Sequence, residues 1–326
     1  GFKGMVEAGA MVEEGIDPLS KAPIHSLYGK TRKPTKEMMQ DVDVLVFDIQ
    51  DIGARYYTYL STLTLAMESA AEENIPFMVL DRMNPLGREV KGPILDMDYS
   101  SFVGMHPLPI QHGMTMGELA FMINEEGWLS DGLKVELEVV KHIGKIEKQD
   151  REQAFDVPPS PNMPNLNTAM NYVGLCLLEG TNVSEGRGTP FPFKVIGAPW
   201  IDNERLLDAM LPYMSNEDMV DTITFIPKDM PGKSMNPKHE DETCHGFHVQ
   251  YLEYPIQWTL YLFDNLFSMY PEDFKFSSFN FIDKLYGNDD LRLTIIDSND
   301  SVEDLFMKWK NEHDDFLKMS KKYYMY

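Results

Sequence analysis

The run Val44-Leu45-Val46-Phe47-Asp48-Ile49 decides the fold of the first half of this chain. It is a short apolar stretch rich in β-branched and aromatic residues, which indicates a buried strand of a parallel sheet. Residues 56–73 follow with apolar side chains at helical spacing, and Phe77-Met78-Val79-Leu80-Asp81 repeats the strand pattern. Strand, helix and strand in this order predict a βαβ unit.

Further elements extend this unit along the chain. Thr115 and Glu118 have the spacing of a capping box and predict the start of a helix, while residues 135–140 read as another strand. Four prolines make 156–168 an irregular loop, and a helix is expected over 167–180.

The character of the sequence changes after the Pro-rich segment 191–200, which we take as a domain boundary. The pattern predicts a domain over residues 1–199 and a smaller α+β domain over 200–326. The elements expected in the second domain are strands at 222–226 and 246–251 and helices at 203–213, 255–269 and 302–318.

The charge of the chain narrows the classes of partner. The 326 residues carry 52 acidic and 29 basic side chains, a net charge of −23. Nucleic-acid binding needs a basic stripe, so no nucleic-acid partner is expected. No apolar run is long enough to span a bilayer, so no stable membrane insertion is expected either. An anionic small substrate would need a local cluster of Arg or His.

The stretch Glu179-Gly180-Thr181-Asn182-Val183-Ser184-Glu185-Gly186-Arg187-Gly188-Thr189 is the densest in chemical groups. It holds two carboxylates, one guanidinium, one amide and three hydroxyls, and its three glycines allow sharp bends and close approach of a ligand. One interpretation is a binding or catalytic loop. The other is a glycine-capped helix end followed by an ordinary polar loop.

Polar loops also follow the two strands of the βαβ unit. Ligands of open α/β sheets collect outside the carboxyl ends of the strands, where both loops are expected to lie. Helix capping and solvation are the competing explanation for Asp48 and Asp81. The candidate residues of the first loop are Asp48, Gln50, Asp51, Arg55 and Tyr56.

Several established signatures are absent from the sequence. It has no phosphate-binding loop, no dinucleotide fingerprint and no nucleophile elbow. Cys244, His245 and His248 match no common zinc spacing, so neither a metal nor a cofactor is predicted. Carboxylates beside aromatic and amide side chains remain, and glycoside hydrolysis uses such a set. A buried carboxyl near an apolar wall would have the raised pKa that an acid needs.

Five motifs together resemble the NamZ-type exo-β-N-acetylmuramidase family, formerly a bacterial domain of unknown function. They occur in the family's order, and the resemblance runs nearly end to end. The motifs are Phe47–Tyr59, Asp81–Gly87, His112–Leu119, Ser160–Pro164 and Glu179–Thr189.

The resemblance implies a glycosidase that releases N-acetylmuramic acid (MurNAc) from the non-reducing end of peptidoglycan fragments. It implies an α/β fold, with a Rossmann-like N-terminal domain of mostly parallel sheet, a smaller α+β domain and a site between them. It also implies a periplasmic or extracellular protein, which a lipoprotein anchor could hold at a membrane. Gly1-Phe2-Lys3-Gly4 resembles the end of a family motif whose Glu-His pair, with the first βα unit, is expected before Gly1.

We combine the residues and the resemblance into a site. Glu185 and Asp51 are the expected catalytic carboxylates, and Arg187 and Arg55 are expected to bind the lactyl carboxylate of MurNAc. A covalent, an inverting and a substrate-assisted route all remain open, and no oligomeric state is predicted. A non-catalytic sugar-binding protein and a peptidoglycan amidase or esterase are the alternatives. The expected substrate-binding residues are Asp48, Gln50, Arg55, Tyr56, His112, Glu179, Asn182 and Arg187.

Overall fold

The predicted βαβ unit is present in the computed structural model, which describes residues 14–143, 148–297 and 300–326. It consists of β3 (Leu45–Phe47), α2 (Tyr59–Glu72) and β4 (Phe77–Leu80). A third strand, β7 (Leu137–Val140), pairs with the other edge of β4. All three strands are parallel, in the order β3-β4-β7, so the chain is a mixed α/β protein as expected.

This sheet is buried on one face. Helices α2 and α3 (Met116–Glu125) share one hydrophobic core with Phe47, Phe77 and Val79. On the opposite face, Val46 is 45% exposed and Val140 is 42% exposed. The expectation of a fully buried strand at 44–49 was therefore wrong for this face, because both helices pack against the other side.

The start of α3 is fastened to the end of β4. Thr115 and Glu118 form the predicted capping box. Asp81, directly after β4, accepts hydrogen bonds from Thr115 Oγ1 and from the Gly117 N–H, both at 2.7 Å. Helix capping, the competing explanation for Asp81, is therefore confirmed.

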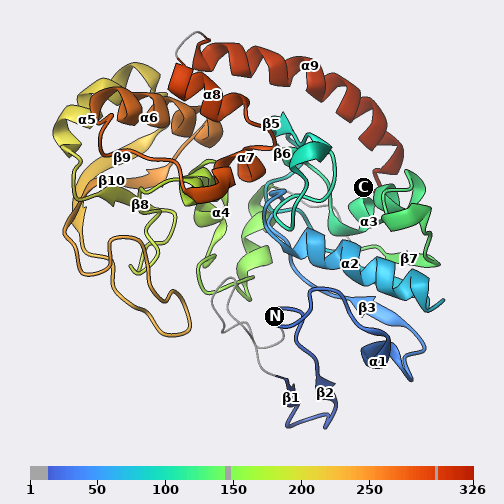
Figure 1. The fold of residues 1–326 in the computed structure, drawn as a ribbon. Coiled ribbons are helices and arrows are strands. Elements are labelled where there is room, and N and C mark those ends of the chain that lie inside the picture. The colour runs from blue at the N-terminus through green and yellow to red at the C-terminus, as the bar shows by residue number, and fades with distance from the viewer. Residues whose placement is uncertain (1–13, 144–147, 298–299) are drawn as a thin grey trace.

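A second sheet lies in the other half of the molecule (Figure 1). It is antiparallel, in the order β8 (Val195–Ala198), β10 (Cys244–Tyr251) and β9 (Met219–Phe225). The division of the chain at 199/200 stays a prediction, and the pairing of β8 with β10 joins strands from its two sides.

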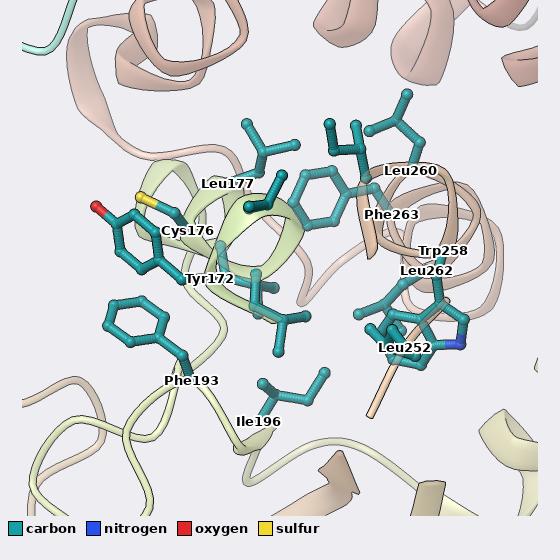
Figure 2. Close-up of a cluster of buried hydrophobic side chains, with 14 of the residues drawn as sticks. Tyr172, Cys176, Leu177, Phe193, Ile196, Leu252, Trp258, Leu260, Leu262 and Phe263 are labelled. Atoms are coloured by element: carbon teal, nitrogen blue, oxygen red, sulfur yellow. The ribbon is translucent and has the colours of Figure 1, made fainter. Parts of the chain in front are cut away.

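Three helices pack around this second sheet. They are α4 (Leu166–Leu175), α5 (Asn203–Met210) and α6 (Pro255–Met269). Figure 2 shows Tyr172, Cys176 and Phe193 on one side of the α4 ribbon and Leu260 and Phe263 on the other. All five residues belong to one buried core cluster, so α4 is packed on both of these sides.

The long helix α9 (Val302–Ser320) connects the two halves of the molecule (Figure 1). Leu305 and Trp309 belong to the core around α4 and α6, whereas Phe316 belongs to the core around the parallel sheet. Burial of its apolar face in both cores ties the halves together.

None of the described helices is both long and apolar enough to cross a lipid bilayer.

The remaining elements are short. The strands β5 and β6 form an antiparallel pair that the sequence pattern did not predict. The short elements are β1 (Gly15–Ile16), β2 (Pro23–Ile24), α1 (Lys36–Met39), β5 (Lys91–Ile94), β6 (Pro109–Gln111), α7 (Phe281–Tyr286) and α8 (Asp290–Asp297).

Candidate active site

A cavity of about 690 Å³ lies beside the end of α4 and the glycine-rich stretch, and we call it the glycine-loop cavity. Segments far apart in the sequence form its wall. Its volume is in the range of ordinary small-molecule sites. The segments that contribute lining residues are 28–32, 56–58, 102–103, 160–163, 172–193, 233–238 and 281–285.

Helical periodicity brings three lining residues to one face. Tyr172, Cys176 and Glu179 follow one another at i, i+4 and i+7 along α4 and the 3-10 turn that continues it to Gly180. The predicted helix 167–180 thus exists, with its last turn tightened. That turn places the Glu179 carboxylate at the cavity wall.

The glycines let the next segment turn back toward β8. Gly186 has φ +82°, and a Cβ there would lie 2.4 Å from the Val195 carbonyl oxygen, so only glycine fits without a shift. Ser184 pairs with Gly197 of β8, and the Phe193 N–H donates to the Glu185 carbonyl. The loop is therefore held at both ends, and Glu185 and Arg187 both line the cavity.

Charges alternate in the centre of the glycine-loop cavity. Glu185 lies 2.9 Å from Lys238 Nζ and 3.4 Å from Arg187 Nε. Arg187 also donates to Glu179 at 2.8 Å. Burial alone would raise the pKa of Glu185, but the Lys238 ammonium and the Arg187 guanidinium outweigh burial and hold it below its usual range. Glu185 is therefore an ionised carboxylate, and the expectation of a raised pKa does not apply to it.

Arg187 is fixed by its surroundings. Burial opposes its charge, but Glu179 and Glu185 together raise its pKa above the usual value. Its guanidinium carbon also lies 5.1 Å from the centre of the Phe193 ring. Arg187 thus orients both carboxylates of the site.

Asp48 and Gln50 lie elsewhere, in a cavity of about 680 Å³ at the carboxyl ends of β3 and β4, the sheet-edge cavity. Asp48 forms an ion pair with Arg82 at 2.6 Å. The Gln50 amide donates to the carbonyls of Asp51 and Met83. The expectation that these loops meet Glu179–Thr189 in one cavity was wrong for Asp48 and Gln50, which line the sheet-edge cavity, whereas Tyr56 and Tyr57 of the same loop do line the glycine-loop cavity.

Asp51 lines neither cavity. Its Oδ2 accepts from the Gly53 N–H at 2.6 Å, and its buried Oδ1 has no hydrogen-bond partner among the described residues. Burial raises its pKa to about 7, against a smaller lowering by the backbone N–H groups of Gly53 and Ile52. Its position gives no support to the predicted catalytic role.

Arg55 is a core residue, which corrects its expected role in binding a carboxylate. Its side chain is 1% exposed, and its guanidinium makes four hydrogen bonds to main-chain oxygens. It joins the β3–α2 loop to β5, to the residue before β6 and to α7, and has little capacity left for a ligand. The acceptors are the carbonyls of Pro93, Leu108, Leu285 and Tyr286, at 2.6–3.0 Å.

His112 is also a core residue. It lines neither cavity, and its Nδ1 accepts from the Met114 N–H at 3.3 Å. Burial lowers its pKa to about 3, so the imidazole is neutral at physiological pH. Its expected hydrogen bond to a sugar is not compatible with this placement.

Tyr56 belongs to the wall of the cavity, whereas Asn182 supports a neighbouring loop. Tyr56 lines the glycine-loop cavity, with its hydroxyl donating to the Val173 carbonyl. Asn182 uses its whole amide to fasten a neighbouring loop, donating to the Asp273 carbonyl and accepting from the Lys275 N–H. Asn182 is therefore a support of the site, not a group of its wall.

Several lining residues were missed by the sequence reasoning. Lys238 comes from a loop distant in sequence and carried no local signal. Arg32 and Phe102 also lie outside the predicted segments, while Ser160 and Asn162 belong to a motif noted only for its resemblance. Only the folded chain brings these groups together.

Comparison with known proteins identifies the family. The N-terminal model of exo-beta-N-acetylmuramidase NamZ matches residues 1–167, and the C-terminal model matches 170–326. The chain is 41% identical to the Bacillus subtilis (strain 168) protein named peptidoglycan beta-N-acetylmuramidase NamZ, over 100% of this chain and 78% of that protein.

Two crystal structures of DUF1343 family proteins from Bacteroides fragilis NCTC 9343 have a similar fold. Their TM-scores are 0.84 and 0.76, at 34% and 35% sequence identity. Each comparison covers 95% of this chain and 82% of the other. The resemblance inferred from the five motifs is thus confirmed, and this chain belongs to the exo-β-N-acetylmuramidase NamZ family.

Proposed function

We propose that this chain is an exo-acting glycosidase that releases MurNAc from the non-reducing end of peptidoglycan fragments. The family and the Bacillus subtilis relative named peptidoglycan beta-N-acetylmuramidase support the activity. The observation in this chain that carries it is the buried, ionised Glu185 between Lys238 and Arg187 in a cavity of about 690 Å³. No cofactor is part of the proposal.

The charge state of Glu185 determines which role it can take. Glycosidases use one protonated carboxyl as an acid and one ionised group to support the oxocarbenium-like centre. The lowered pKa of Glu185 suits the second role, as a base, a nucleophile or an electrostatic partner of the anomeric carbon. We therefore assign Glu185 to the charge-supporting side of the reaction, while substrate assistance by the acetamido group remains open.

Glu179 and Arg187 act through Glu185 in this proposal. Arg187 bridges the two carboxylates, so that Glu185 keeps its direction when substrate displaces water. Tyr57, Tyr172 and Phe193 supply apolar wall for the sugar ring. We regard Glu179 and Arg187 as positioning residues.

Product analysis tests the proposal against its alternatives. Peptidoglycan fragments with MurNAc at the non-reducing end are incubated with the protein, and the products are separated and weighed by mass spectrometry. Free MurNAc is the expected product. Released peptide would indicate an amidase and released lactate an esterase, and tight binding without any product would indicate a sugar-binding protein.

We also propose a Rossmann-like N-terminal part and a periplasmic or extracellular location. The parallel order β3-β4-β7 supports the first. The location follows from the substrate, because the cell wall lies outside the cytoplasmic membrane. Fractionation of cells expressing the native gene tests this, and recovery of the protein with the cytoplasm would contradict it.

A further inference from the structure

The described wall of the glycine-loop cavity is positively charged, although the whole chain carries −23. Among the residues that the structure describes, its charged lining residues are four cations and two carboxylates. Glu179 and Glu185 account for the carboxylates, so this part of the wall has a formal surplus of two positive charges. A surplus of this sign in an acidic protein favours an anionic ligand. The four cations are Arg32, Arg187, Lys233 and Lys238.

Two of these cations are already occupied. Lys238 has three N–H donors, and it spends them on the Leu178 carbonyl at 2.7 Å, the Val183 carbonyl at 3.1 Å and Glu185 at 2.9 Å. Arg187 is shared by Glu179 and Glu185. A ligand carboxylate at either position would compete with a buried carboxylate of the site.

Arg32 is in a different situation. It forms no ion pair within the described part of the chain, whereas its neighbour Lys33 is bound by both Glu68 and Glu72. The guanidinium carbon of Arg32 lies 4.1 Å from the centre of the Phe102 ring, and Phe102 packs edge-to-face on Tyr28. Stacking uses the face of the guanidinium and leaves its N–H edge free for a bidentate contact with a carboxylate.

We propose that Arg32, held on Phe102, binds the lactyl carboxylate of MurNAc and so distinguishes it from N-acetylglucosamine (GlcNAc). This rests on the proposed function, and it replaces the earlier assignment of that contact to Arg55 and Arg187. The lactyl ether sits on O3, two ring carbons from the anomeric carbon. The cation that binds it must therefore line the same cavity as Glu185 and be separate from the charges that hold Glu185, as Arg32 is. Lys233 is the weaker candidate, since an ammonium cannot make the planar bidentate contact.

Equilibrium binding of the free sugars tests Arg32 without turnover. Calorimetry of the full chain with MurNAc and with GlcNAc is compared for the wild type, Arg32→Gln and Arg32→Lys. Arg32→Gln should weaken MurNAc binding by about 10- to 100-fold, the worth of a charge-assisted bidentate contact. GlcNAc binding should not change, and Arg32→Lys should restore part of the loss. Arg205→Gln, which removes an exposed cation of α5 outside the cavity, is the matched control and should bind like the wild type.

Three outcomes would overturn the assignment. They are a wild type that does not prefer MurNAc over GlcNAc, an Arg32→Gln variant with unchanged MurNAc affinity, and an equal loss for both sugars. A chromogenic MurNAc glycoside is tested in parallel. If the wild type binds MurNAc without turning over the glycoside, the glycosidase proposal is refuted and the Arg32 result stays valid. If the wild type turns the glycoside over and Arg32→Gln changes nothing, the Arg32 proposal is refuted and the glycosidase proposal stands.

Discussion

The glycine-loop cavity and the sheet-edge cavity have nearly the same volume, about 690 and 680 Å³, and opposite charge. Leaving His142 aside, the described charged residues of the sheet-edge wall are one cation and four carboxylates. They are Arg82, Asp48, Asp81, Asp150 and Asp156. The glycine-loop wall, counted over the same described ranges, has four cations and two carboxylates.

The two cavities also differ in what their polar groups do. At the sheet edge, Asp81 caps α3 and accepts from the Tyr326 hydroxyl, and Asp48 is paired with Arg82. These groups maintain the fold. In the glycine-loop cavity the carboxylates are paired with cations, and within the described part of the chain Arg32 and Lys233 form no ion pair, of which Arg32 is the proposed ligand contact. The strand-end rule for α/β proteins therefore located a cavity, and the charges decide which cavity suits an anionic sugar.

The largest effect on stability is expected at Arg55, which was expected in the site from the sequence but lies in the core. Arg55→Gln removes donors from up to four buried carbonyls, which should lower the free energy of unfolding by about 4 kcal/mol or more. Urea unfolding measures this, with Arg32→Gln as the control that should stay close to the wild type. Equal stability of the two variants would contradict the distinction between them.

Along the chain, Asp51 lies between residues that line the sheet-edge cavity and residues that line the glycine-loop cavity. Ionisation of its carboxyl should make the free energy of unfolding depend on pH. Its pKa is about 7 in the folded chain against 3.8 ordinarily, so the folded state binds more protons between these values. The contribution is complete below about pH 4 and is lost as the pH rises through 7, by roughly 4 kcal/mol in all. Asp51→Asn should remove this fall. Melting temperatures between about pH 4 and 8 measure it, and parallel curves for both proteins would refute it.

The turnover of one variant at Glu185 and one at Asp48 compares the roles of the two cavities in activity. Glu185→Gln keeps the shape of the side chain and loses its charge, so turnover of a chromogenic MurNAc glycoside should fall at least about 100-fold, near 2.7 kcal/mol of barrier. Asp48→Asn, in the sheet-edge cavity, should stay within about twofold of the wild type. Circular dichroism checks that both fold. Near-normal turnover by Glu185→Gln would remove it from the mechanism, and a large loss in Asp48→Asn would move the site to the sheet edge.

The smallest expected effect is a difference in stability between variants of two glycines, one that shapes the site and one that does not. Gly186→Ala places a Cβ against the Val195 carbonyl oxygen at φ +82°, whereas Gly127→Ala meets nothing within 4 Å at φ +69°. The left-handed backbone alone costs about 1 kcal/mol at Gly127, and the clash adds about 2 kcal/mol at Gly186. Urea unfolding of both variants gives the difference. Equal losses would mean that the loop relaxes at no cost.

Much of the fold could be predicted from local pattern. The strands of the βαβ unit, the capping box at Thr115 and the helix at 255–269 were predicted where the structure has them. These are features of periodicity and of side chains three residues apart, which short-range sterics and hydrogen bonding govern. The β5–β6 pair was missed, because its pairing depends on contacts distant in sequence.

The site was predictable only in part. The glycine-rich stretch carried Glu179, Glu185 and Arg187 to the cavity wall, as its composition indicated. Arg55 and Arg32 are equivalent in sequence, each an arginine in a polar loop, and burial alone makes one a core residue and the other a candidate ligand contact. Lys238 is close to Glu185 only after folding.

The sequence by itself determined the type of each main element, the place of the flexible glycines and membership of the family. The tertiary structure decided which loops share a cavity, which carboxylate is ionised and which of the described cations form no ion pair. The reason is physical: secondary structure follows from neighbours along the chain, whereas a pKa or an unpaired charge depends on groups that the fold brings from afar.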